Sequence, residues 1–330
     1  MKTTPLLLVA ALMLLASCTE DPLYPGRHPQ VRINYLPSLP SGFYYELWVS
    51  APASSGKKTG TSHADNEFSS IGRFVVTLSG EALGLDGNAP MFFIPASIDP
   101  NLLTDAIVTI QQQGVDPSMP GRRLLSGDFV GTDIHAYDTL TMDGREAFDG
   151  PLSGNLGAFV LDAPTSEVGS DSARGIWFVR IERDPFTDQA LDTLPGLTVR
   201  DLPISEENSG WTYQAWLVRT RAGESTEYIP LGRFLKGGAP DSDTAGPGAG
   251  AQPNIHYAAP GSDFVTGMAR TLNDGTYGVV ISMEPDNIDP VRPGVQLLSR
   301  DRIEADLPSR RTYDMTRPAN GPSVTIYLDR

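Results

Sequence analysis

The chain has 330 residues, of which 40% are hydrophobic and 20% are charged, as expected for a folded protein of about two domains. Its formal net charge of −15 disfavours nucleic acids and anionic membrane surfaces as partners. The 33 Gly and 28 Pro residues follow no collagen-like period, so they indicate many turns and therefore many short strands.

The N-terminus has the pattern of an export signal. Lys2 precedes an apolar run over 6–15 that is too short to span a bilayer, and Leu15-Ala16-Ser17-Cys18 follows at once. Small residues directly before a cysteine resemble the lipobox of bacterial lipoproteins, which implies a signal peptide over 1–17 and a lipid on Cys18. The alternative is an ordinary signal peptide with a chance cysteine. Because Cys18 is the only cysteine, no disulfide or multi-cysteine metal site can form within the chain.

Two features behind Cys18 bear on location. Residues 18–30 are polar and proline-rich, so we expect a tether between the lipid and the fold. Glu20 and Asp21 resemble the signal that sends some bacterial lipoproteins to the cell surface. We therefore expect an outer-membrane lipoprotein of the cell envelope, on either its periplasmic face or the cell surface.

The strongest pattern in the chain is an internal repeat. Residues 279–301 (VVISMEPDNIDPVRPGVQLLSRD) align without a gap on residues 106–128 (AIVTIQQQGVDPSMPGRRLLSGD), and the identical positions include the Asp-Pro and Pro-Gly dipeptides. These dipeptides mark a turn between two apolar strands. Each copy is therefore predicted to be a β-hairpin.

Shorter segments repeat in the same order. The matched pairs are 31–40 with 194–203, 42–49 with 210–218, and 71–75 with 231–235. In the second pair, Tyr45 and Trp48 (or Tyr213 and Trp216) are three residues apart and face opposite sides of a strand, so we expect one in the core and the other at a flank or edge. In the third pair, the shared Gly-Arg-Phe is either a binding motif or, as we expect, a Gly at a bulge, a solvent-facing Arg and a core Phe.

The remaining segments complete a predicted all-β fold. Strands are expected over 137–142, 157–161 and 175–180 as extra strands of the first domain, and over 323–328 as the last strand of the second. We predict two tandem antiparallel β-sandwich (Ig-like) domains from an internal duplication. Their expected bounds are 31–183 and 194–330, with a charged linker over 184–193, one short helical turn within 99–106 and a disordered-looking loop over 237–254.

Three motifs of the second copy resemble the extracytoplasmic C-terminal domain of anti-sigma-K factors. They are YQAWLV (213–218), LGRF (231–234), and VISMEP (280–285) with its following Pro-Gly turn. The resemblance covers about 210–300 and, more faintly, 42–128. It implies a β-sandwich module outside the cytoplasm with a sensing or interaction role. Asp286-Asn287 stand where the family has Gly-Gly, and sigma-binding helices, zinc ligands and a transmembrane helix are absent from the sequence, so direct binding of a sigma factor is not implied.

Patterns that would indicate catalysis or metal binding are sparse. Neither a G-x-S-x-G elbow before a helix nor a phosphate loop is present, and no histidine stands in a metal-ligand spacing. We therefore predict a protein without catalytic residues or cofactors; the alternative is an envelope glycan hydrolase with a spatial pair of carboxylates. The four histidines are His28, His63, His135 and His256.

A few acidic residues remain candidates for binding. Asp241-Ser242-Asp243, and Asp143-Gly144 with Asp149-Gly150, could coordinate calcium through loop oxygens, although acidic turns usually bind no metal. Glu284 stands where a strand becomes a turn. We expect its carboxylate to accept backbone N–H bonds of the same turn, with a functional role as the alternative.

These observations predict a non-enzymatic, lipid-anchored envelope protein that binds or senses. Its partner is expected to be an envelope protein or a glycan, and binding is expected on loops displayed by a rigid scaffold, including 237–254. A structural spacer is a third hypothesis.

Overall fold

The computed structural model describes residues 28–51, 67–115, 119–130, 135–144, 147–149, 154–202, 210–242, 246, 258–286 and 289–329. The predicted signal peptide, the lipidation site Cys18 and most of the predicted tether lie outside these residues, as does most of the loop over 237–254.

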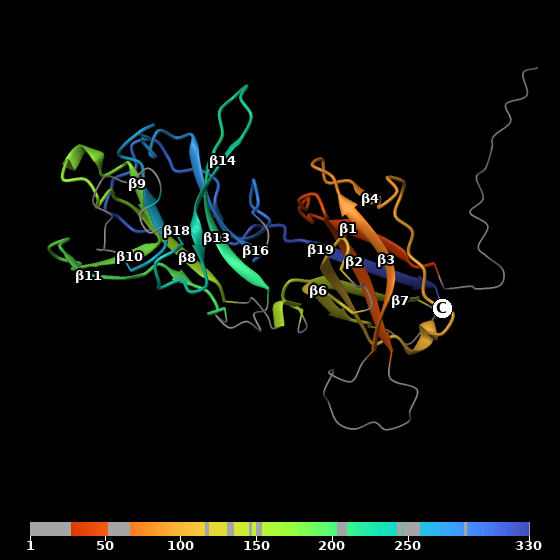
Figure 1. The fold of residues 1–330 in the computed structure, drawn as a ribbon. Coiled ribbons are helices and arrows are strands. Elements are labelled where there is room, and N and C mark those ends of the chain that lie inside the picture. Colours follow the sequence, from red (N-terminus) through yellow and green to blue (C-terminus); the bar gives the residue numbers. More distant parts are fainter. Residues whose placement is uncertain are drawn as a thin grey trace, which may run out of the picture.

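The described chain is nearly all β, which confirms the predicted fold class. Its strands pair antiparallel and form two lobes that lie side by side (Figure 1). Helix among the described residues is limited to short 3-10 turns. They are Pro100–Leu102, which confirms the turn expected within 99–106, Ala147–Asp149 and Gly169–Asp171.

The first lobe is one eight-stranded sheet that nearly closes on itself, with the order β1-β19-β7-β6-β5-β2-β3-β4. Its inward-facing side chains are apolar and buried, as the alternation along the strands requires. The strands are β1 (Gln30–Asn34), β2 (Phe43–Ala51), β3 (Glu67–Val76), β4 (Ala82–Gly84), β5 (Asp105–Gln112), β6 (Arg122–Asp128), β7 (His135–Thr141) and β19 (Ser323–Asp329).

The second lobe packs two sheets against each other, as in a β-sandwich. One sheet has the order β14-β13-β16-β17, and the other has the order β12-β8-β9-β15 with β18 paired to β8. The strands are β8 (Leu156–Leu161), β9 (Gly175–Trp177), β12 (Leu197–Thr198), β13 (Trp211–Arg219), β14 (Glu227–Phe234), β15 (Gly261–Asp263), β16 (Tyr277–Pro285), β17 (Val295–Arg300) and β18 (Tyr313–Met315).

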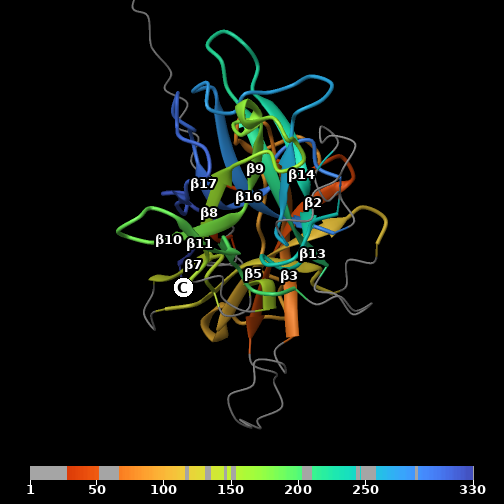
Figure 2. The same ribbon diagram turned by 90° about the vertical axis from the view of Figure 1, so that its left-hand side faces the viewer.

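The predicted linker over 184–193 is part of a hairpin instead. Strands β10 (Val179–Arg183) and β11 (Ala190–Pro195) pair antiparallel and project from the second lobe (Figure 2). In the turn between them, the Asp184 carboxylate accepts the backbone N–H groups of Phe186 and Thr187, each at 2.8 Å. The charged residues therefore form an ordered turn, which the sequence pattern alone did not distinguish from a linker.

The sheets also divide the chain differently from the predicted domain bounds of 31–183 and 194–330. The C-terminal strand β19, expected in the second domain, pairs with β1 and β7 of the first lobe and buries Val324, Ile326 and Leu328 there. Strands β8 and β9, expected in the first domain, lie in the second lobe. The chain therefore leaves the first lobe after β7 and returns to it for β19. The predicted bounds were wrong because alternation identifies a strand but not its partner.

Four strands of each lobe nevertheless share one arrangement. The order β3-β2-β5-β6 in the first lobe matches β14-β13-β16-β17 in the second. Each repeated segment forms the predicted antiparallel hairpin, and its register shifts at the same place, after Val108 in one copy and after Ile281 in the other. The sequence repeat thus corresponds to two four-stranded units with equivalent pairing.

Each unit buries both of its aromatic residues, so the expectation that one would lie at a flank or edge is wrong. The tyrosine hydroxyl donates to a backbone carbonyl and the indole N–H donates to a hydroxyl, which satisfies the polar group of each ring. The bonds are Tyr45 to Pro37 (2.7 Å), Tyr213 to Arg200 (2.9 Å), Trp48 to Thr109 (2.9 Å) and Trp216 to Ser282 (2.8 Å).

The shared Gly-Arg-Phe has a structural role, as expected for its Gly and Phe, but its Arg is half-buried and hydrogen-bonded instead of facing solvent freely. Phe74 and Phe234 are buried in the core. The side chain of Arg73 is 39% exposed and donates to Glu46 on the neighbouring strand at 2.7 Å. Leu47 of β2 pairs with Gly72 and Trp48 pairs with Ser70, so Ile71 is the extra residue of a bulge next to the Gly.

Candidate binding cleft between the lobes

The two lobes are packed firmly together. A single contiguous cluster of buried apolar side chains extends through both of them. At the crossing between the lobes, the ring of Phe148 meets the ring of Trp211 edge to face at 4.8 Å. Arg200 donates to the backbone carbonyl of Phe148. The interface therefore combines apolar packing with a hydrogen bond from Arg200 to the Phe148 backbone carbonyl.

A charged pair reinforces this interface. Arg122 at the start of β6 donates to the Asp286 carboxylate just after β16, at 2.7 Å. Asp286 in turn donates its backbone N–H to the carbonyl of Gly210 at 2.9 Å and accepts a hydrogen bond from Arg233 at its own carbonyl. A Cβ at Gly210 would overlap the Arg122 guanidinium, so this close approach requires glycine.

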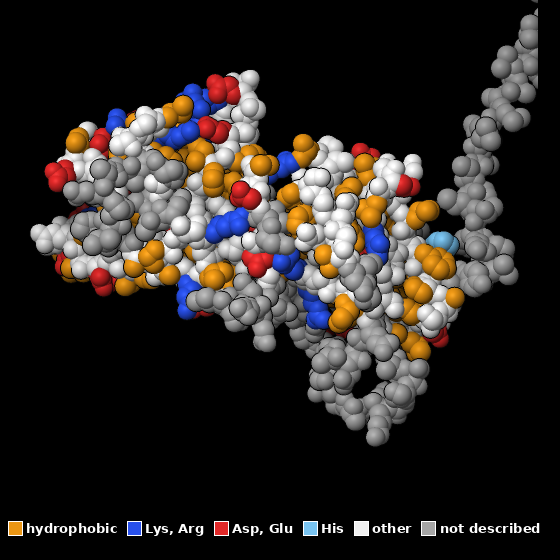
Figure 3. Space-filling model, viewed as in Figure 1, with side chains coloured by type: hydrophobic (Ala, Val, Ile, Leu, Met, Phe, Trp, Pro, Cys, Tyr) orange, Lys and Arg blue, Asp and Glu red, His pale blue; other side chains and the backbone are white. Residues whose placement is uncertain are grey.

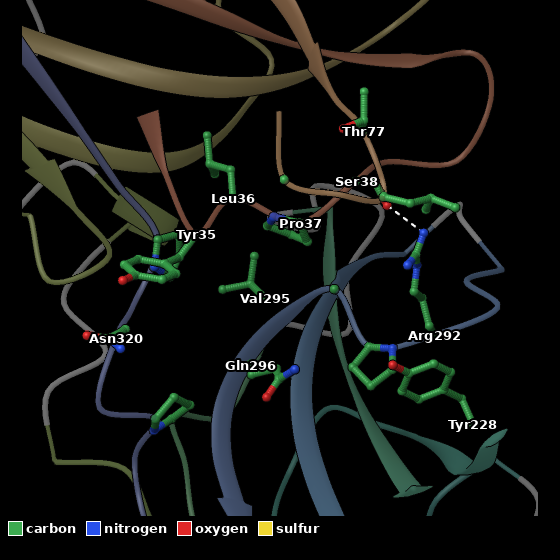
Figure 4. A pocket seen from close by; sticks show the side chains of 16 residues that line it. Tyr35, Leu36, Pro37, Ser38, Thr77, Tyr228, Arg292, Val295, Gln296 and Asn320 are labelled. Atoms are coloured by element: carbon green, nitrogen blue, oxygen red, sulfur yellow. Dashed lines mark hydrogen bonds between the residues drawn. The ribbon is translucent and has the colours of Figure 1, made fainter. Parts of the chain in front are cut away.

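A hollow of about 340 Å³ lies beside this interface, which we call the inter-lobe cleft. One wall is the segment 35–38, which follows β1, together with the turn after β3. The opposite wall is the segment 292–296, which ends the repeated turn and begins β17, and residues 318–322 close one end. Figure 3 shows the surface indented where the lobes meet, and Figure 4 shows the side chains around the cleft.

Buried apolar residues form the floor of the cleft, and exposed polar residues surround it. Leu36 and Val295 are 4% and 3% exposed. Tyr35, Gln296 and Asn320 project around the hollow from different segments (Figure 4), and Tyr35 is 66% exposed. Within the described part of the chain, no hydrogen bond engages these three side chains. An apolar floor with a few available polar groups is typical of a ligand site.

The charge of the cleft differs from that of the protein. Among the described residues that line it, Arg292 is the only charged one. Its guanidinium donates to the Ser38 hydroxyl at 2.8 Å and thereby joins the two walls. The described lining of the cleft thus carries no carboxylate, although the net charge of the chain is −15.

Behind Arg292 lies a smaller hollow of about 110 Å³, which Glu284 and Asp289 also line. Glu284 is 3% exposed and accepts hydrogen bonds from the Gly294 backbone N–H and the Ser282 hydroxyl, each at 2.6 Å. This confirms the expectation that it accepts a backbone N–H of its own turn. Burial raises the pKa of the Glu284 carboxyl to about 7, although the two hydrogen bonds lower it.

The same position in the first copy is occupied by Gln111. Its amide donates to the backbone carbonyl of Met119 at 3.2 Å, within the equivalent turn. An uncharged side chain thus serves the same turn in the first lobe. We conclude that the main role of Glu284 is to hold the β16–β17 turn, one wall of the cleft, in place.

The other described residues singled out from the sequence do not line this cleft. Asp241 accepts the backbone N–H of Gly261 at 2.8 Å, and Asp143 pairs with Arg317 at 3.2 Å. His28 lies against the ring of Phe93 at 5.2 Å. No group of three or more His, Cys, Asp or Glu side chains able to hold a metal occurs in the described ranges. His135 begins β7, Asp149 ends a 3-10 turn, and Asp243, His63, His256 and Cys18 lie outside the described residues.

Sequence reasoning missed the residues that surround the cleft. Tyr35 lies in one repeated segment, 31–40, and Gln296 lies in another, 279–301. Both segments were recognised as repeats, but nothing in the sequence showed that they meet. The detectable signal was a departure from the repeat: Arg292, which bridges the walls, stands where the first copy has Met119.

Comparisons with known proteins leave the function open. No family model, no curated protein and no solved structure matches this chain. In the part of the chain that the structure describes, no helix has the length and apolar character needed to cross a membrane.

Proposed function

We propose that this protein is a non-enzymatic, lipid-anchored protein of the bacterial cell envelope that binds a ligand in the inter-lobe cleft. The observation that carries the proposal is the cleft itself, in which available polar side chains surround a buried apolar floor. The lipid anchor rests on the lipobox-like sequence that ends at Cys18.

The chemistry of the lining residues favours binding over catalysis. Among the described residues that line the cleft, none is His, Cys, Asp, Glu or Lys, the side chains that most often act as acids, bases or strong nucleophiles. A glycan hydrolase would need two carboxylates on either side of a bound sugar. Glu284 belongs to the neighbouring smaller hollow, where its carboxylate holds the turn.

We also propose that the two four-stranded units arose by internal duplication. Their common strand order, register shifts and hydrogen bonds support this origin. Together with the resemblance to the extracytoplasmic domain of anti-sigma-K factors, it favours a binding or sensing module. In this proposal, each lobe contains one of the two equivalent units, and both lobes contribute residues to the same cleft.

The proposal is tested by measuring occupancy of the cleft in the envelope. The Asn320→Cys variant places a thiol at the cleft, and the Leu85→Cys variant places one on the exposed surface of the first lobe. Full-length variants are labelled with a maleimide in intact envelopes and after purification. We expect the thiol at 320 to be labelled more slowly in envelopes than after purification, because a bound ligand covers it. The thiol at 85 should be labelled at the same rate in both. Equal protection at both positions, or at neither, contradicts the proposal.

A further inference from the structure

Resting on the proposed function, we infer that the inter-lobe cleft binds an oligosaccharide. In this inference, the ring of Tyr35 stacks on a sugar face, and the amides of Gln296 and Asn320 hydrogen-bond to sugar hydroxyls. Three observations support the inference: the Tyr35 ring is exposed at the cleft, the two amides have no hydrogen-bond partner among the described residues, and the described lining has no carboxylate.

Tyr35 is displayed at the cleft in an unfavourable backbone conformation. Its φ is 54°, a region that bulky L-residues rarely adopt, and its side chain remains 66% exposed. Such backbone strain is typical of functional sites. The ring gains little from burial to offset this strain, because it lines the open cleft (Figure 4). The negative face of an aromatic ring attracts weakly positive C–H groups, which a pyranose presents as a flat surface.

The two amides match the hydroxyl groups of a sugar. Each offers two N–H donors and one carbonyl acceptor, and each sugar hydroxyl both donates and accepts. Gln296 is exposed on β17, whereas its neighbours Val295 and Leu297 are buried. Asn320 lies in the segment that returns the chain to the first lobe. Among the described residues neither amide has a hydrogen-bond partner, so both are available to a ligand.

The remaining polar groups of the cleft are consistent with a hydroxyl-rich ligand. Tyr228, on the edge strand β14, adds a second aromatic ring that is 36% exposed. Arg292 donates one of its N–H groups to Ser38, and its remaining donors and its positive charge stay at the cleft. With no carboxylate among the described lining residues, the cleft does not repel a neutral or an acidic sugar chain.

The test is affinity electrophoresis of the full-length protein in native gels that contain a soluble polysaccharide. The probes are xylan, glucomannan, amylopectin, yeast mannan and polygalacturonate, each in a separate gel. We expect at least one to slow the protein. Tyr35→Gly is the decisive variant, because it removes the ring and relieves the positive φ, so it should fold at least as well as the parent. It should weaken binding by about tenfold, and Gln296→Ala should also weaken it.

Tyr327→Ala is the matched control, since it removes a tyrosine that is 40% exposed on β19 and does not line the cleft. It should leave the migration unchanged, and Tyr35→Phe should retain most of the binding. If Tyr35→Gly and Tyr327→Ala migrate like the parent in the gel that slows it, the cleft is not the sugar site. If no polysaccharide slows the protein while position 320 is still protected in envelopes, the ligand is not a carbohydrate, although the proposed function stands. If both results are negative, both proposals fail.

Discussion

Arg122 in the first lobe donates to the carboxylate of Asp286 in the second at 2.7 Å, although 164 residues separate them in the chain. Their side chains are 24% and 34% exposed, so the pair is partly shielded from solvent. Because it joins the turn end of one repeated hairpin to the turn end of the other, it contributes to the orientation of the lobes and thus to the width of the cleft.

Breaking this pair should lower stability modestly. We expect Arg122→Ala and Asp286→Ala each to reduce the free energy of unfolding, with a coupling energy of about 1 kcal/mol in a double-mutant cycle measured by urea denaturation. The exposed pair of Arg180 and Asp314 provides a control with a smaller coupling. A coupling near zero for Arg122 and Asp286 would show that this pair does not help to set the arrangement of the lobes.

Glu284→Gln should change how stability depends on pH. The folded-state pKa of Glu284 is raised to about 7 from 4.5, so the unfolded chain loses this proton at lower pH than the folded chain does. Stability of the parent therefore falls as pH rises from about 4.5 to 7. The variant lacks this loss and should gain stability relative to the parent, by on the order of 2 kcal/mol between pH 5 and pH 8. Parallel pH profiles of urea denaturation for parent and variant would contradict the assignment.

Asp138→Asn should act in the same direction in the first lobe. Burial, together with the smaller effect of the nearby Asp128 charge, raises the pKa of Asp138 to about 7. One carboxylate oxygen of Asp138 has no hydrogen-bond partner among the described residues. Because the folded-state pKa is raised, the parent again loses stability as pH rises above the pKa of the unfolded state. The variant should therefore be more stable than the parent at pH 8, and its advantage over the parent should be smaller at pH 5. Asp301→Asn, at an exposed position, serves as the control in the same denaturation series.

The equivalent indole hydrogen bonds should have similar energies in the two lobes. Trp48→Phe and Trp216→Phe remove donors that are 2.9 Å from Thr109 and 2.8 Å from Ser282. Each variant loses a buried hydrogen bond and leaves a hydroxyl without its donor, at a cost of about 1–3 kcal/mol. Chemical denaturation of both variants measures this cost. A large difference between them would argue that the two units are not energetically equivalent.

Cys18→Ala should release the protein from the membrane. If Cys18 carries the lipid, the variant fails to incorporate radiolabelled palmitate and is recovered in the soluble fraction. Ser17→Ala keeps the small residue before the cysteine and should be lipidated like the parent. Continued membrane association of Cys18→Ala without palmitate would contradict the proposed anchor.

The sequence by itself determined the local structure. Turn chemistry and alternation depend on neighbours in the chain, so the all-β class, both repeated hairpins and the roles of the Gly and Phe in Gly-Arg-Phe were predictable. The backbone bond that Glu284 accepts was predictable for the same reason, because Gly294 belongs to the same turn.

Only the tertiary structure decided which strands share a sheet and which loops meet. β19 has the alternation of any half-buried strand, and its place between β1 and β7 depends on apolar surface contributed by distant parts of the chain. Likewise, Tyr35 and Gln296 lie on the same cleft because the chain crosses between the lobes twice. Strand partners are selected by burial over the whole chain rather than by local pattern, which is why the repeat was visible in the sequence and the cleft was not.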